Sequence, residues 1–88
     1  MKKTDKTLQR LLSGRGDHNI DFSDLIALLV AEGFIERRGK GSHVIFTKPG
    51  VAERITLQPD WSKAKAYQVL QIRVILTRLA KPETDEEL

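Results

Sequence analysis

Histidine is the side chain whose ordinary titration range suits proton transfer near neutral pH, and this sequence contains two, His18 and His43. His18 stands in the segment 14–19, which is rich in glycine and other turn-forming residues, so we expect an exposed loop side chain without a catalytic role. His43 follows Gly41 and Ser42 at the start of an apolar run, where a strand would hold its imidazole ring in place. His43 is therefore the candidate for acid–base chemistry.

Basic residues surround His43 in the sequence. Arg37, Arg38 and Lys40 precede it, and Lys48 follows at the next turn. In a hairpin of this length, the four cations could line one edge and bind phosphates while His43 moves a proton. RNA carries its own nucleophile, the 2′-hydroxyl, so its cleavage needs little more than a base and cations that stabilise the charged phosphorane. This pattern points to RNA cleavage that requires no metal and no other cofactor.

The composition argues against several other kinds of site. The sequence has no cysteine, which excludes disulfides and thiolate metal sites. Two histidines without a carboxylate pair at ligand spacing argue against a catalytic metal site. The sequence also contains no glycine-rich phosphate loop and no nucleophile elbow. A lone histidine on a strand is more often structural than catalytic, so the residues by themselves leave both roles open for His43.

Length and charge predict one small basic domain. With 88 residues and 10.0 kDa, the chain can bury only a modest core, so any chemistry should lie on an open surface. We expect a single domain over 1–80, whereas 81–88 holds four acids and one base and is predicted to be a disordered tail. The basic domain suits a polyanionic partner, although ordinary solvated charge is the alternative. Without an apolar run of signal or membrane-spanning length, we expect a soluble, cytoplasmic protein with no membrane partner.

The segment 22–32 gives the clearest helical signal. Its apolar residues recur three and four positions apart and should face the core; they are Phe22, Leu25, Ile26, Leu29 and Val30. Asp21 is expected to cap the first turn with its side chain, and Ile20 to pack on Leu25 across the cap. Gly33 should end the helix in the left-handed conformation.

Beyond Gly33 the period becomes that of strands. The runs 34–38, 42–47 and 54–58 are rich in Phe, Ile, Val and Thr and are separated by turn-forming residues at 39–41 and 48–50. In the third run, apolar and polar residues alternate, which is typical of a sheet with one buried and one solvated face. The sequence leaves open whether His43 lies on the buried or the solvated face.

Two further helices complete the prediction. A short one covers 6–12, because its leucines share a face and Gly14 follows. A long one covers 66–79, and its core-facing seam is expected to be Val69, Ile72, Leu76 and Leu79. A neighbouring apolar strip on this helix consists of Tyr67, Leu70 and Val74. We expect this apolar strip to extend the core, with a docking surface as the alternative.

The predicted order is helix, helix, three antiparallel strands, helix. This is an α+β architecture, and it resembles the double-stranded-RNA-binding fold, although that fold also supports other activities.

The motifs of this sequence resemble those of the HicA family of toxin–antitoxin systems. The main one is Lys-Gly-Ser-His-Val-Ile-Phe at 40–46, in which glycine, serine and histidine precede an apolar residue and a phenylalanine. The segments 21–25, 57–59, 63–69 and 71–73 resemble the family as well, in the same order and spacing.

The resemblance implies that the protein is a toxin, a ribonuclease that acts on messenger RNA with His43 as its catalytic residue. Gly41 and Ser42 carry over as the turn that presents the histidine. The implied partner is a HicB-type antitoxin, with which the toxin, expected to be a monomer alone, would form a higher-order complex. Lys63, Lys65 and Arg73 match basic positions of one branch of the family, and we infer that they contact RNA.

The sequence departs from the family pattern on its last helix. Leu70 and Val74 replace residues that are usually charged, which makes a partner contact through the apolar strip more credible. Two alternatives to a ribonuclease remain. One is a non-catalytic RNA-binding module of the same fold, in which His43 has no required role. The other is a protein-interaction domain whose active surface is the apolar strip.

Overall fold

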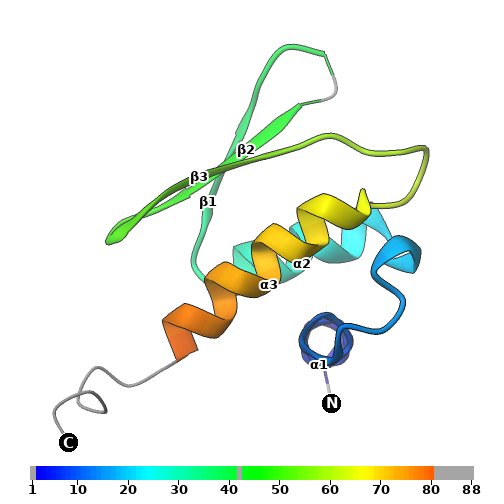
Figure 1. Ribbon diagram of the computed structural model, residues 1–88. Coiled ribbons are helices and arrows are strands. Elements are labelled where there is room, and N and C mark those ends of the chain that lie inside the picture. Colours follow the sequence, from blue (N-terminus) through cyan, green and yellow to red (C-terminus); the bar gives the residue numbers. More distant parts are fainter. Residues whose placement is uncertain (1, 42, 81–88) are drawn as a thin grey trace, which may run out of the picture.

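The computed structural model describes residues 2–41 and 43–80 and shows helices packed against one face of an antiparallel sheet (Figure 1). In chain order the elements are α1 (Lys3–Ser13), the 3₁₀ turn η1 (Asp17–Asn19), α2 (Phe22–Ala31), β1 (Ile35–Arg38), β2 (Val44–Lys48), β3 (Val51–Leu57) and α3 (Ala66–Ala80). This confirms the predicted α+β order. The acidic segment 81–88 lies outside the described residues.

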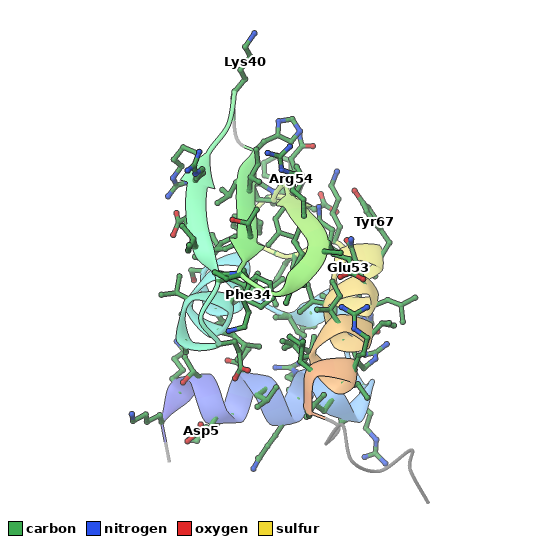
Figure 2. All side chains as sticks on the ribbon, turned by 90° about the vertical axis from the view of Figure 1, so that its left-hand side faces the viewer. Asp5, Phe34, Lys40, Glu53, Arg54 and Tyr67 are labelled. Carbon is green, nitrogen blue, oxygen red and sulfur yellow. The ribbon has the colours of Figure 1, made fainter. Side chains whose placement is uncertain are left out.

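The elements form three layers. In Figures 1 and 2, α2 and α3 lie between the sheet and α1, which crosses beneath them. The core cluster draws buried side chains from all three helices and from β2 and β3. Because all three helices lie on the same side of the sheet, the opposite face of the sheet stays open. None of the helices in the described part of the chain is long and apolar enough to span a membrane.

Helix α2 buries most of the predicted stripe, since Phe22 and Ile26 also pack against the core, but the buried arc differs at two positions. Leu25, Leu28 and Leu29 are buried, whereas Val30 is half exposed, so the prediction that Val30 faces the core is wrong. Since α2 contacts α1 as well as the rest of the core, its buried arc is shifted toward Leu28. Gly33 has a φ of 96° and ends the helix as predicted.

The start of α2 is held by a contact that the sequence did not predict. Asp21 occupies the cap position, but its side chain makes no capping hydrogen bond. Its carboxylate instead accepts a hydrogen bond from Lys63 Nζ at 2.6 Å. The Lys63 ammonium is the stronger partner for a carboxylate and competes with the helix amides. The predicted side-chain cap is therefore wrong, although the predicted first residue of the helix is right.

The strand register decides which face of the sheet is buried. The sheet has the order β1-β2-β3, and Val44 of β2 pairs with Arg38 of β1 and Leu57 of β3. Val44, Phe46 and Leu57 are fully buried. Because side chains alternate along a strand, the residues on either side of Val44 belong to the open face. The register thus answers the question that the sequence left open for His43.

Helix α3 covers the core with one arc only. Val69, Ile72 and Leu76 are buried as predicted, but Ile75 is also buried, whereas Leu79 is 41% exposed. The apolar strip of Tyr67, Leu70 and Val74 is 64%, 51% and 58% exposed, so the expectation that it extends the core is wrong. Layered packing covers one side of α3 and leaves this neighbouring side open. The same holds on α1, which starts at Lys3 and leaves Leu12 half exposed.

An ion pair joins α3 to the edge strand. Arg78 donates to both carboxylate oxygens of Glu53, at 2.6 and 2.7 Å, from α3 to β3. These hydrogen bonds lower the pKa of Glu53 to about 2. Figure 2 shows Glu53 beside α3, where the pair fixes the helix against the sheet at its open edge.

Candidate functional site

His43 lies exposed immediately before β2, at the end of the β1–β2 loop. Its Nδ1 lies 3.0 Å from the carbonyl oxygen of Lys40. A carbonyl can only accept a hydrogen bond, so this contact assigns the proton of the neutral ring to Nδ1. The other ring nitrogen, Nε2, is then the free base. The imidazole is both oriented by the backbone and accessible from solvent.

The loop that presents His43 is closed by its own backbone. Gly39 N–H donates to the carbonyl of His43 at 2.9 Å, and His43 N–H donates to that of Lys40 at 3.3 Å. Gly41 has a φ of 64°, a left-handed conformation that glycine adopts without steric cost. A Cβ at Gly39 would lie in ordinary contact with that of His43, at 3.4 Å. Ser42 lies outside the described residues.

Three of the predicted cations lie near His43. Arg37 and Arg38 are exposed on β1, where they pair with Ile45 and Val44, the residues that directly follow the histidine. Arg38 also lies 3.3 Å from Glu36 in an exposed ion pair. Lys40 projects from the tip of the β1–β2 loop (Figure 2). Because paired residues share a face of the sheet, Arg37 lies on the open face with Ile45, whereas Arg38 lies on the face of Val44. Of the two arginines, only Arg37 therefore lies on the face to which His43 belongs.

Lys48 does not join this group. It is the last residue of β2, five positions after His43, and five steps along a strand place the two residues about 17 Å apart. Its ammonium donates to the carbonyl of Glu32 at 2.9 Å and lies 5.9 Å from the centre of the Phe34 ring. Lys48 therefore caps the C-terminal end of α2, and the predicted edge of four cations does not form.

Arg73 is engaged within the protein. Its guanidinium makes two hydrogen bonds to the Asp17 carboxylate, both 2.9 Å, and a third to the carbonyl of Leu11 at 3.0 Å. The hydrogen bond from Arg73 lowers the pKa of Asp17 below its usual value. These contacts tie α3 to η1 and to the end of α1. Arg73 could reach RNA only by giving up contacts that hold the layers together.

Replacing Arg73 with methionine should therefore reduce stability rather than RNA affinity. We expect Arg73→Met to lower the free energy of unfolding by about 1–3 kcal/mol, because the Asp17 carboxylate loses a two-pronged, partly buried partner. Urea unfolding measures this. The matched control is Arg37→Gln, which removes an exposed cation and should change stability by less than about 0.5 kcal/mol. If Arg73→Met were as stable as Arg37→Gln, this assignment would be contradicted.

Lys63 and Lys65 precede α3. Lys63 is held by the Asp21 carboxylate, and this hydrogen bond lowers the pKa of Asp21. It lies at the rim of a cavity of about 260 Å³ beside α1, which Lys3, Lys6 and Arg10 also line. Lys65 is half buried immediately before α3, and its carbonyl accepts hydrogen bonds from the N–H groups of Gln68 and Val69. No hydrogen bond or ion pair among the residues described here connects either lysine to His43.

Two residues near the site were missed by the sequence argument. Arg54 is exposed on β3, and because its neighbour Ile55 points into the core, Arg54 belongs to the open face of the sheet. Trp61 lies in the connection from β3 to α3, is 94% exposed and has a φ of 62°. The available signal was a large aromatic residue within the turn-forming stretch 59–62.

Across 2–41 and 43–80, no three side chains of His, Cys, Asp or Glu come together as ligands for a metal ion.

Comparison with known protein families identifies the chain. Residues 22–79 match the model described as HicA toxin of bacterial toxin–antitoxin systems, and this match spans more than half of the sequence. The chain belongs to the HicA toxin family. As a HicA toxin it is one member of a toxin–antitoxin pair, so an antitoxin is its partner. No curated protein and no solved structure matches the chain.

The family match leaves out the N-terminal part of this HicA toxin. It begins at Phe22, the first residue of α2, so α1 and η1 precede it. It includes His43, the sheet and nearly all of α3. The loop of His43 and the apolar strip are thus parts of the HicA region, whereas α1 is packed onto it from outside.

Proposed function

We propose that this HicA toxin is a metal-independent endoribonuclease that cleaves messenger RNA in the cytoplasm, with His43 as the general base and acid. The observation that carries the proposal is the orientation of the exposed imidazole, whose Nδ1–H is bound by the Lys40 carbonyl, so that Nε2 is the unprotonated nitrogen of the neutral ring. A base fixed in this way can reach the 2′-hydroxyl of an RNA laid across the loop.

The proposed reaction uses only the RNA and this chain. His43 Nε2 removes the proton from a ribose 2′-hydroxyl, and the resulting oxygen attacks the adjacent phosphorus. The bond from phosphorus to O5′ breaks, and the protonated imidazole returns a proton to O5′. The products are a 2′,3′-cyclic phosphate and a 5′-hydroxyl. Arg37 and Lys40 would stabilise the charge on the phosphorane, Arg38 on the other face of β1 would bind a neighbouring phosphate, and Gly41 would let the backbone approach the RNA.

The proposed RNA surface is centred on the β1–β2 loop. Arg54 extends it across the open face of the sheet, and Lys65 and the Asp21-bound Lys63 are secondary candidates at the β3–α3 connection. Each phosphate contact releases counterions, so binding should weaken as salt rises. Lys48 and Arg73 are not part of this proposed surface, because both are occupied by contacts within the protein.

Purified toxin and a defined messenger RNA in excess EDTA test the proposal. We expect cleavage to continue and the upstream fragment to end in a cyclic phosphate. A matched RNA with a single 2′-deoxyribose at the cleaved position should resist cleavage at that position, because its nucleophile is missing. Salt-sensitive RNA binding without cleavage at any pH would instead favour the non-catalytic RNA-binding module. Cleavage of the 2′-deoxy substrate would contradict the proposed reaction.

We also propose that the apolar strip on α3 binds a HicB-type antitoxin, giving a higher-order complex from a toxin that is monomeric alone. Its three side chains are each more than half exposed on one side of α3. A soluble domain gains stability when a partner covers such a patch.

Charges placed in the apolar strip should abolish antitoxin binding. We expect Leu70→Glu combined with Val74→Lys to weaken it by at least about 100-fold, because two apolar contacts become desolvated charges. Titration calorimetry measures the loss, and RNA affinity should stay unchanged. The control is Gln9→Glu combined with Leu12→Lys, which places the same charges on the exposed face of α1 and should leave binding intact. If both double variants bind equally well, the antitoxin contacts another surface.

A further inference from the structure

Trp61 is the only tryptophan of this sequence and, among the described residues, its most exposed large apolar side chain. It lies in a tight turn that is closed by two backbone hydrogen bonds. Asp60 N–H donates to the Lys63 carbonyl at 2.8 Å, and Lys63 N–H donates to the Asp60 carbonyl at 3.1 Å. The exposed ring therefore belongs to a turn whose backbone is held by hydrogen bonds between Asp60 and Lys63, on either side of Trp61.

The position is unfavourable for tryptophan. Its φ of 62° lies in the left-handed region, which glycine adopts freely and bulky side chains rarely occupy. With 94% of the residue exposed, the indole gains no packing that would compensate for this conformation. Strained backbone of this kind is concentrated at functional sites. Neither the local backbone conformation nor packing in the core explains why a tryptophan occupies this position. We therefore infer that its indole contacts a ligand that is not part of this chain.

The turn leaves the sheet at the end where His43 lies. Leu57, the last residue of β3, pairs with Val44, the residue after His43. Four residues of chain connect Leu57 to Trp61, a reach of at most about 14 Å. Figure 1 shows the β3–α3 connection and the β1–β2 loop extending from the same end of the sheet. Trp61 is thus within a few nucleotides of any RNA held at His43.

The surroundings of Trp61 favour RNA over a protein partner. Its neighbours in the chain, Asp60 and Ser62, are exposed and polar, and Lys63, which is bound to Asp21, follows two positions later. The centres of protein interfaces are apolar and depleted in charge. Single-stranded RNA is instead bound by isolated aromatic rings among cations, on which unpaired bases stack.

We propose that Trp61 is a stacking platform for an unpaired base of the RNA, a short distance along the strand from the ribose at His43. This inference rests on the proposed ribonuclease function and adds the substrate class, namely single-stranded rather than duplex RNA. The platform holds the strand against the toxin while His43 carries out the proton transfers. Because every base has a flat face, this contact tolerates different sequences.

The single tryptophan makes the test direct. The probe is a single-stranded RNA of about ten nucleotides, added to the full-length His43→Ala protein so that no cleavage occurs. We expect the indole fluorescence to be quenched and to saturate with the same affinity that the anisotropy of labelled RNA reports. A duplex of equal length should quench much less, because its bases are already stacked. Trp61→Ala should weaken single-strand binding about tenfold, and Trp61→Phe should recover most of it.

A second variant separates stacking from folding. Trp61→Gly relieves the left-handed strain, so its thermal midpoint should equal or exceed that of the parent, while its RNA affinity falls as in Trp61→Ala. Unchanged fluorescence at saturating RNA, unchanged affinity of Trp61→Ala, or absence of RNA binding would each overturn the proposal. Quenching by the antitoxin but not by RNA would also overturn it. If RNA quenches the fluorescence but the wild-type toxin cleaves nothing, the stacking platform stands and the proposed catalysis fails.

Discussion

Replacing His43 with alanine is expected to slow RNA cleavage by about 10²–10⁴-fold, the usual contribution of a positioned acid–base group. The variant loses the Nε2 that removes the ribose proton, and the cations of the loop remain. In cells, induced expression of His43→Ala should no longer arrest growth. The rate is measured in single-turnover reactions on the same messenger RNA, with EDTA present.

Folding and partner binding provide the controls for this variant. His43 is exposed, and its hydrogen bond to Lys40 is a surface contact, so stability should change by less than about 0.5 kcal/mol. Affinity for the antitoxin through the apolar strip should be unchanged. His18→Ala is the matched control, because His18 is exposed in η1 and should be dispensable. If His43→Ala remains fully toxic, His43 is not the catalytic residue.

Removing the ring of Phe46 should have the largest effect on stability. Phe46 lies at the middle of β2, is fully buried and belongs to the core cluster between the sheet and the helices. We expect Phe46→Ala to cost about 3–5 kcal/mol, from the lost burial and the cavity that remains. This loss is a large part of the free energy of unfolding of a typical domain, which is about 5–15 kcal/mol. Urea unfolding followed by circular dichroism measures the loss.

A neighbouring residue shows whether burial is the cause. Ile45 lies on the same strand but on the open face and is only partly buried, so Ile45→Ala should cost less than half as much. Phe46→Leu keeps most of the volume and should cost under about 1.5 kcal/mol. Since Phe46 is three residues after His43, unfolding of β2 should also abolish RNA cleavage. Equal losses in Phe46→Ala and Ile45→Ala would mean that the open face is covered in solution.

Periodicity in the sequence was sufficient for the order and type of the elements. Helical spacing predicted α2 and α3, runs rich in Phe, Ile, Val and Thr between turn-forming residues predicted the strands, and Gly33 predicted the end of α2 at a positive φ. His43 could be singled out as the candidate because few side chains titrate near neutral pH, and the motif around it resembled the family that the chain belongs to. These features depend on residues close together in the chain, so local physics determines them.

Tertiary packing decided what each charged side chain contacts. Lys48, Lys63 and Arg73 were all predicted to contact RNA, yet each is bound to a group brought near by folding, namely the Glu32 carbonyl, Asp21 and Asp17. A long cationic side chain can reach many partners, and the fold alone decides which is in range. The missed Trp61 belongs here too, since its exposure and backbone conformation follow from the closed turn.

The extent of burial was likewise decided by the assembled layers. A helical period shows that one face is apolar, but not how wide an arc the neighbouring elements cover. Val30 and the apolar strip are apolar yet exposed, because α1, α2 and the sheet cover only part of each helix. The sequence by itself therefore determined the elements and the candidate base, whereas contacts between distant segments decided which cations are free for RNA and which apolar surface is free for a partner.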